Sequence, residues 1–139
     1  MKKHLILLVL LPLFFACSDS GFNNKNPYLP NYTFTIDINM NLPAYSNLQY
    51  ASNAVYYASV GAKGIYIFNT GSGYNAFDAA CPNQALSSCS TMTLKGINVV
   101  CPCDSTEYSL FTGLSQTGLQ YPLKQYRVEV NGTNLRVYN

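Results

Sequence analysis

The chain has 139 residues and a formal net charge of +2, with 10% charged and 14% aromatic side chains. A chain of this length is expected to fold as one domain, and its weak charge leaves no basic surface of the kind that binds nucleic acid. The 12 tyrosines and 7 phenylalanines favour a β-rich folded domain over a disordered chain.

The N-terminus has the layout of a secretory signal peptide. Two lysines at 2–3 precede an apolar run over 5–15, which is shorter than the roughly 20 residues that a bilayer-spanning helix needs. Phe14-Phe15-Ala16-Cys17 is similar to a bacterial lipobox, whose cysteine becomes the lipidated N-terminus. We therefore predict a signal peptide at 1–16 and a membrane anchor on Cys17. The alternative is a cleaved signal that leaves Cys17 as a free thiol.

Cleavage after Ala16 would leave 123 residues with six basic and six acidic side chains, and hence no net charge. Ser18 follows the lipidated position, where an aspartate would be typical of retention in the inner membrane. We therefore predict a cell-envelope protein that is lipid-anchored in the outer membrane, on its periplasmic or surface face. His4 is the sole histidine, so its removal excludes Ser-His-Asp and Cys-His catalysis.

The first half of the exported chain is predicted to contain a tether and three strands. Residues 17–31 are polar and interrupted by glycine and proline, which indicates a flexible tether. Apolar and polar side chains alternate over 32–42, as in a half-buried strand. Residues 48–53 indicate a loop or a short turn. Residues 54–60 and 65–68 are rich in β-branched and aromatic side chains and are expected to pair as a hairpin.

The second half is predicted to contain further short strands and no helix. These strands are expected at 74–79, 92–94, 97–100, 108–111, 126–130 and 135–137. We expect 92–94 and 97–100 to pair, and 108–111 to return toward the first strands. Asn131-Gly132 favours a hairpin turn between the last two strands. The same residues with Thr133 form a glycosylation sequon, but the turn is the preferred interpretation.

Four of the five cysteines lie within 80–113. Cys81 and Asn83 are separated by one residue, Cys101 follows after seventeen more, and Asp104 after another two. With histidine at 83 and 104, this spacing would be the motif of a Rieske 2Fe-2S domain. The segment from Cys101 to Tyr108 also resembles the second Rieske loop, Cys-Pro-x-His-Gly-x-x-Phe.

Residues 32–139 are thus identified as similar to the Rieske family, with 80–113 as the former cluster-binding loops. Phe77-Asp78 before the first loop, together with Gly118 and 122–126 after the second, fits this resemblance. The resemblance implies an all-β fold in which small antiparallel sheets form a base and an inserted subdomain carries the two loops.

Two of the four former cluster-ligand positions depart from the family. A Rieske centre needs imidazole on one iron, whereas an amide stands at Asn83 and a carboxylate at Asp104. An amide oxygen is a weak ligand for iron, and a carboxylate suits harder metals. We therefore predict that Cys81, Asn83, Cys101 and Asp104 hold neither a cluster nor another metal.

The four cysteines left after Cys17 suit two disulfides in an oxidising compartment. The resemblance implies Cys81–Cys101, because both would ligate the same iron, and Cys89–Cys103, which match the paired cysteines of high-potential members. Cys89 lies eight positions after Cys81, whereas the family spacing is about five. The pairs Cys81–Cys103 and Cys89–Cys101 therefore remain open.

These features favour an exported lipoprotein whose Rieske-like domain is a disulfide-stabilised binding or structural module, with a possible protein partner in the cell envelope and no catalytic residue. The alternative is a 2Fe-2S electron-transfer or oxidoreductase component with non-standard ligands, such as four cysteines. A redox-active disulfide and a glycan-binding module with exposed Tyr and Asn are further hypotheses. Asp104 and Glu107 are expected to be solvated acids, and 104–106 also resembles an O-glycosylation site.

Overall fold

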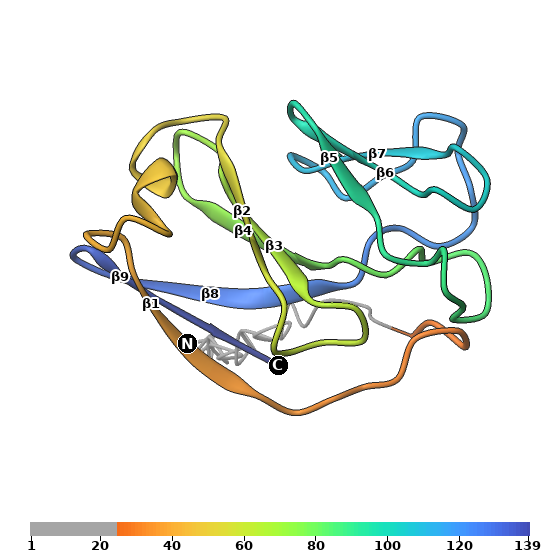
Figure 1. Ribbon diagram of the computed structural model, residues 1–139, viewed down its shortest axis with the longest axis horizontal. Coiled ribbons are helices and arrows are strands. Elements are labelled where there is room, and N and C mark those ends of the chain that lie inside the picture. The colour runs from red at the N-terminus through yellow and green to blue at the C-terminus, as the bar shows by residue number, and fades with distance from the viewer. Residues whose placement is uncertain (1–24) are drawn as a thin grey trace, which may run out of the picture.

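A computed structural model describes residues 25–139 of the chain (Figure 1). The predicted signal peptide at 1–16 and the predicted lipidation of Cys17 lie outside the described residues. Within 25–139 the chain forms nine strands in two antiparallel sheets and a four-residue 3-10 helix. No helix in this range has the length and apolar character needed to cross a membrane.

The larger sheet has the strand order β1-β9-β8-β4-β3-β2 and forms the base of the molecule. Its strands are β1 (Thr35–Asn39), β2 (Ala54–Tyr57), β3 (Ile65–Asn69), β4 (Tyr74–Asp78), β8 (Gln125–Asn131) and β9 (Asn134–Tyr138). The 3-10 helix η1 (Ser46–Gln49) lies between β1 and β2 in the sequence and buries Leu48.

The smaller sheet has the order β5-β6-β7 and belongs to an inserted subdomain between β4 and β8. Its strands are β5 (Thr93–Lys95), β6 (Asn98–Val100) and β7 (Glu107–Ser109). In Figure 1 this sheet stands apart from the base at the upper right, and the connections to β4 and β8 run beneath it. The sequence therefore folds as predicted, with a loop-bearing subdomain inserted into an antiparallel base.

Strand β3 connects the two parts of the molecule because both of its faces are buried. Ile65 and Ile67 point to a core that also receives side chains from β1, η1, β4, β8 and β9. Tyr66 and Phe68 point to a second core, shared with the inserted subdomain. Successive side chains of a strand alternate between faces, so five consecutive buried residues in β3 serve two cores at once.

The predicted hairpins form, with small differences at their turns. β2 pairs with β3 through Ala54–Phe68 to Tyr57–Ile65, so the strand predicted at 54–60 ends at Tyr57, where residues 58–63 turn. In the last hairpin Asn131 pairs with Asn134, which makes Gly132 and Thr133 the two turn residues. Gly132 alone has a positive φ, of 63°, as the first central residue of a type II′ turn requires.

Two strand predictions need correction. The strand expected at 32–42 is regular only over β1, because Leu42 N–H donates to Asn39 C=O and turns the chain away. The strand expected at 108–111 is regular only over 107–109, as β7, where it pairs with β6. The segment does return to the base, because Tyr108 and Leu110 pack in the core that contains Tyr66 and Phe68. Asn75 Nδ2 on β4 donates to the carbonyls of Leu110 and Phe111, each at 3.0 Å, and the Phe111 ring lies edge-on to Phe68 at a centroid distance of 4.8 Å.

The described part of the predicted tether, 25–31, packs against the domain. Leu29 is only 4% exposed, and Asn26 Nδ2 donates to the carbonyl of Pro82 at 2.7 Å. The Tyr28 ring lies edge-on to Tyr121, with a centroid distance of 6.0 Å. In Figure 1 this segment, drawn in orange, passes beside the green loop that follows β4. The chain therefore enters the domain next to the first disulfide-bearing loop.

Candidate functional site

The two special loops are closed by backbone hydrogen bonds at their bases. In the first loop Cys81 N–H donates to Ser90 C=O at 2.8 Å, and Met92 N–H donates to Ala79 C=O at 2.7 Å. In the second loop Cys101 N–H donates to Thr106 C=O at 2.9 Å, and Ser105 N–H donates back to Cys101 C=O at 2.8 Å. These bonds hold the four cysteines on short, constrained segments.

The structure bonds Cys81 to Cys101 and Cys89 to Cys103, with Cα–Cα distances of 5.5 and 5.2 Å. These are the pairs that the family resemblance implied. Cys81 and Cys101 are 1% and 0% exposed and belong to the core between base and subdomain, whereas Cys89 is exposed and Cys103 half-buried. One bridge is therefore internal and the other reaches solvent.

Three of the sulfurs form a compact group. The Sγ atoms of Cys81, Cys101 and Cys103 all lie within 4.8 Å of one another. Cys103 thus brings a sulfur of the accessible bridge next to both sulfurs of the internal bridge. The Cys-Pro-Cys sequence produces this proximity, because it places Cys101 and Cys103 two residues apart in one tight loop.

Two polar side chains that the sequence analysis did not identify lie against the sulfurs. Gln84 Nε2 donates to Cys101 Sγ at 3.1 Å. The Ser87 hydroxyl lies 3.2 Å from Cys89 Sγ and 3.7 Å from Cys103 Sγ, where it can donate to either. The contacts of Gln84 with Cys101 and of Ser87 with Cys103 form only where the two loops approach in space, whereas Ser87 and Cys89 are two residues apart in the first loop.

Asn83 fixes the segment that covers the loops. Its Nδ2 donates to the carbonyl of Tyr121 at 2.7 Å and to the hydroxyl of Tyr108 at 3.0 Å, while its Oδ1 accepts the N–H of Tyr121 at 3.0 Å. An amide suits this position because it donates and accepts at once. The side chain at the position where the Rieske motif has its first histidine therefore holds the chain that precedes β8.

Asp104 satisfies a backbone group of its own loop. Its Oδ1 accepts the N–H of Thr106 at 2.9 Å, as aspartate commonly does two residues ahead of itself in turns. Ser105 between them has a positive φ of 62°, so the loop turns sharply here. The carboxylate at the position where the Rieske motif has its second histidine thus stabilises a turn on the exposed surface.

Together, these residues do not fit the cluster that the fold family carries. Such a cluster needs two thiolates and two imidazoles, whereas here the two sulfurs are bonded to each other and residues 25–139 contain no histidine. The Asn83 amide makes three hydrogen bonds to protein groups. A carboxylate such as Asp104 suits hard cations better than iron-sulfur chemistry.

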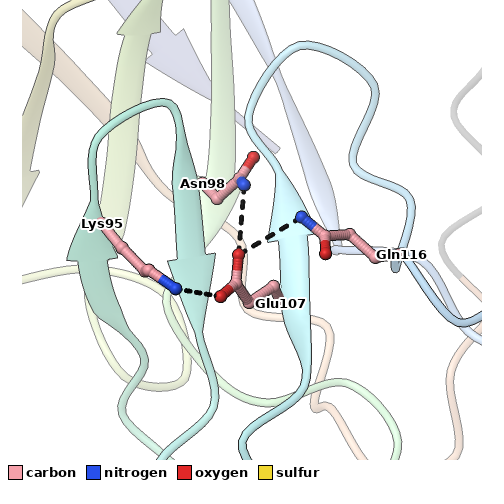
Figure 2. Close-up of polar contacts among 4 residues, drawn as sticks. All are labelled: Lys95, Asn98, Glu107 and Gln116. Atoms are coloured by element: carbon pink, nitrogen blue, oxygen red, sulfur yellow. Dashed lines mark hydrogen bonds and ion pairs between the residues drawn. The ribbon is translucent and has the colours of Figure 1, made fainter.

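Glu107 is separate from Asp104 and belongs to the outer face of the small sheet (Figure 2). Its carboxylate pairs with Lys95 on β5 and accepts hydrogen bonds from Asn98 at 3.3 Å and Gln116 at 3.2 Å. The hydrogen bond from Lys95 is the main cause that lowers the pKa of Glu107. This group connects β5, β6, β7 and the following loop, so it is an exposed structural contact.

Asp78 is the main buried acid below the loops. It is 0% exposed and accepts the N–H groups of Ala62, Lys63 and Ala80 at 2.6, 3.3 and 2.8 Å. It also accepts the hydroxyl of Tyr126 at 2.7 Å, and burial, followed by the Asp78 charge, raises the pKa of that tyrosine. One carboxylate therefore joins the β2–β3 turn, the first loop and β8.

Lys124 anchors the N-terminal segment to the same region. Its ammonium donates to the carbonyl of Pro30 at 2.8 Å and to Asn31 Oδ1 at 3.0 Å, although the residue is only 2% exposed. Burial lowers the pKa of Lys124, and the charge of Asp78 acts in the opposite direction. A separate shallow groove of about 260 Å³ lies between residues 32–34 and 59–61 and includes none of the loop residues.

Comparison with known proteins supports the fold but assigns no family by sequence. No family model matches the chain, and no curated protein matches it. A chain in the complex of reduced oxygenase and oxidized ferredoxin in carbazole 1,9a-dioxygenase shares 20% identity with a TM-score of 0.50, covering 76% of this chain and 92% of that one.

Two further solved structures show weaker likeness. The ferredoxin of carbazole 1,9a-dioxygenase from Nocardioides aromaticivorans shares 17% identity over 63% of this chain and 86% of its own, with a TM-score of 0.44. A ferredoxin of Sphingomonas yanoikuyae B1 shares 16% identity over 67% of this chain and 93% of its own, with a TM-score of 0.47. The likeness to the chain with a TM-score of 0.50 confirms the predicted all-β, Rieske-like fold at the level of architecture.

Proposed function

We propose that this protein is a membrane-anchored lipoprotein of the cell envelope, whose Rieske-like domain carries no cluster and works as a disulfide-stabilised binding or structural module. One observation carries the proposal. Each of the four residues at the former ligand positions already has a partner within the protein, and these partners are a disulfide, a hydrogen-bonded backbone pair and a turn.

The internal bridge takes the structural place of a cluster in this proposal. A cluster would join the two loops through metal, and here Cys81–Cys101 joins them covalently within the shared core. Closing a loop of this length is worth about 3 kcal/mol in the chain-entropy model. The domain can therefore keep both loops in place without iron.

Metal and thiol analysis of the same sample tests the cluster-free state. The full chain, purified from the cell envelope, is expected to contain no stoichiometric iron, no acid-labile sulfide and, once Cys17 is acylated, no free thiol. Stoichiometric iron with a visible charge-transfer spectrum would contradict the proposal. It would favour the alternative 2Fe-2S electron-transfer component, with the grouped sulfurs of Cys81, Cys101 and Cys103 among its ligands.

The position of the N-terminal segment supports a binding role close to the membrane. Because Asn26 and Tyr28 contact the loop region, an anchor at Cys17 would attach the loop-bearing end of the domain to the lipid through the eight residues at 18–25. Large apolar side chains are exposed on the first loop and on the segment between β7 and β8, including Leu86 at 37%, Leu114 at 58% and Leu119 at 40%. Such residues suit contact with an envelope protein.

Anchoring is tested by Cys17→Ser in the full chain. The unchanged protein is expected in the membrane fraction and to carry acyl chains detectable by mass spectrometry, whereas the variant is expected to lose both properties. Cys89→Ser/Cys103→Ser serves as the matched control, because it removes cysteines without touching the anchor. An unchanged membrane fraction for Cys17→Ser would overturn this part of the proposal.

A further inference from the structure

We propose that the Cys89–Cys103 disulfide is an exchange site for external thiols, and that Cys103 passes the exchange inward to the Cys81–Cys101 bridge. The external reactant is a small thiol or a cysteine of another exported protein. The inference rests on the cluster-free state proposed above. Metal analysis tests the cluster-free state, whereas thiol mapping tests the exchange. Either proposal can therefore be contradicted without the other.

Solvent exposure determines which sulfur an external thiol attacks first. Cys89 is exposed and Cys103 half-buried, while Cys81 and Cys101 are at most 1% exposed. A thiolate from solvent therefore reaches Cys89 Sγ before any other sulfur. Its attack forms a mixed disulfide on Cys89, breaks the Cys89–Cys103 bond and leaves the electron pair on Cys103. The Ser87 hydroxyl, 3.7 Å from Cys103 Sγ, can donate to that thiolate.

The short distances between Cys103 Sγ and the internal bridge allow the second exchange step. Cys103 Sγ lies within 4.8 Å of both sulfurs of the internal bridge, and rotation of its side chain closes the remaining distance. Attack on Cys81 forms Cys81–Cys103 and expels Cys101 as a thiolate. Gln84 Nε2 lies 3.1 Å from Cys101 Sγ and can stabilise the charge there, because hydrogen bonds to a charged form favour it. Cys101 is therefore the preferred leaving group.

The chemistry balances with two external thiols. The first forms the mixed disulfide with Cys89, and the second releases it as an external disulfide. The protein gains two electrons and two protons, which appear as thiols on Cys89 and Cys101. No positively charged group is needed in this scheme, because the neutral donors Gln84 and Ser87 lie at the sulfurs.

Single cysteine variants of the full chain test the inward step without any reductant. Cys89→Ser leaves a thiol on Cys103, which lies beside the internal bridge, and Cys103→Ser leaves one on Cys89, which lies outside the sulfur group. After acid quenching, alkylation and peptide mapping, Cys89→Ser is expected to distribute its thiol between Cys103 and Cys101. Cys103→Ser is expected to keep its thiol on Cys89. A thiol confined to Cys103 in Cys89→Ser would overturn the proposal.

Gln84→Met provides a more specific test of the leaving group. In the Cys89→Ser background it is expected to lower the ratio of Cys101 thiol to Cys103 thiol by about threefold to tenfold, the effect of one hydrogen bond between uncharged groups. Gln49→Met is the matched control, since Gln49 donates to Met40 C=O far along the chain from the cysteines. An unchanged ratio in Gln84→Met would remove Gln84 from the scheme.

The unmodified full chain keeps the proposal testable if the variants do not fold. Brief exposure to reduced glutathione, followed by acid quenching, is expected to place glutathione on Cys89 and a free thiol on Cys103 or Cys101. Glutathione attached to Cys81 or Cys101 would mean that the internal bridge reacts directly. That result would overturn both the order of attack and the role of Cys103.

Discussion

At the scale of single residues, the buried polar groups below the loops have the clearest roles. Asp78 joins two backbone segments and Tyr126 through one carboxylate, and Asn83 joins two aromatic residues across the loops. The sequence pointed to both positions through the family resemblance. It did not reveal their partners, because those partners lie up to 48 residues away along the chain.

Asp78→Asn is expected to destabilise the fold by about 3 kcal/mol, because it removes charge-assisted hydrogen bonds and turns an amide N–H₂ toward backbone donors. Urea unfolding with the disulfides intact measures the change. Asp37→Asn is the control, since Asp37 is exposed and pairs only with Arg136 at the surface, where ion pairs contribute little. Equal losses in the two variants would refute the role given to Asp78.

Asn83→Ala is expected to loosen the segment around Tyr121. The substitution leaves the N–H and C=O of Tyr121 without their side-chain partner, at a cost of about 1–3 kcal/mol if they stay shielded from water. Amide hydrogen exchange at Tyr121 should accelerate, and protease cleavage near residues 114–121 should increase. Unchanged exchange would mean that Asn83 does not hold this segment.

At the scale of elements, turns determine where the strands end. Gly64 has a φ of +84°, and an added Cβ would lie 2.5 Å from the Tyr56 ring. Tyr56 in turn donates through its hydroxyl to Lys63 C=O at 2.8 Å, which packs its ring across the β2–β3 turn. Gly96 has a φ of +62° with nothing within 4 Å of an added Cβ. Alanine substitutions at these two glycines therefore distinguish the cost of backbone strain from the cost of steric crowding.

Gly96→Ala is expected to cost about 1–2 kcal/mol, the penalty for a left-handed backbone with a side chain. Gly64→Ala is expected to cost about 1–3 kcal/mol more, because the new methyl group must displace the Tyr56 ring. Denaturant midpoints of the two variants provide the comparison. Equal destabilisation would show that the ring moves away freely and that crowding has no part in forming this hairpin.

At the scale of the whole molecule, two cores hold base and subdomain together. Burial is the main cause that raises the pKa of Tyr66, Tyr108 and Tyr126, each of which is at most 6% exposed. Tyr66 and Tyr108 lie in the core that contains the internal disulfide, and Tyr126 lies in the base core. The stability of both cores is therefore expected to depend on pH in the alkaline range.

Stability is expected to fall as pH rises above about 10, the ordinary pKa of tyrosine. The unfolded chain then loses protons that the folded chain keeps, so each buried tyrosine lowers the free energy of unfolding by up to about 1.4 kcal/mol per pH unit. Lys124 opposes this slightly, because its lowered pKa makes stability rise with pH just below the ordinary lysine value. Urea unfolding at several alkaline pH values measures the slope.

Tyr66→Phe should reduce that alkaline slope by the share of one tyrosine. Its hydroxyl donates to Met92 C=O at 2.9 Å, so the variant also loses some stability at neutral pH. The loss at neutral pH and the change in alkaline slope can be measured separately, because the slope of the free energy of unfolding against pH depends only on how many protons the folded and unfolded states bind. An unchanged slope would mean that Tyr66 ionises with the protein folded.

Local patterns in the sequence were enough to predict the strands and their antiparallel pairing. Alternation over 126–130 and 135–137, and the β-branched residues at 65–68, depend only on neighbours a few positions apart. The same reasoning extended the strands at 32–42 and 108–111 beyond their true ends, because hydrogen bonding to other segments decides where a strand ends.

The sequence by itself determined the all-β class and the set of cysteines, since these follow from residue types and patterns, and the two-loop subdomain was implied by the resemblance to the Rieske family. Only the tertiary structure decided which sulfurs meet, which side chains donate to them, and that Leu29 and Asn26 pack on the first loop. Asn26 and Pro82 are 56 residues apart. Contacts of that kind depend on how separate loops approach after both cores have formed, and no local pattern encodes that approach.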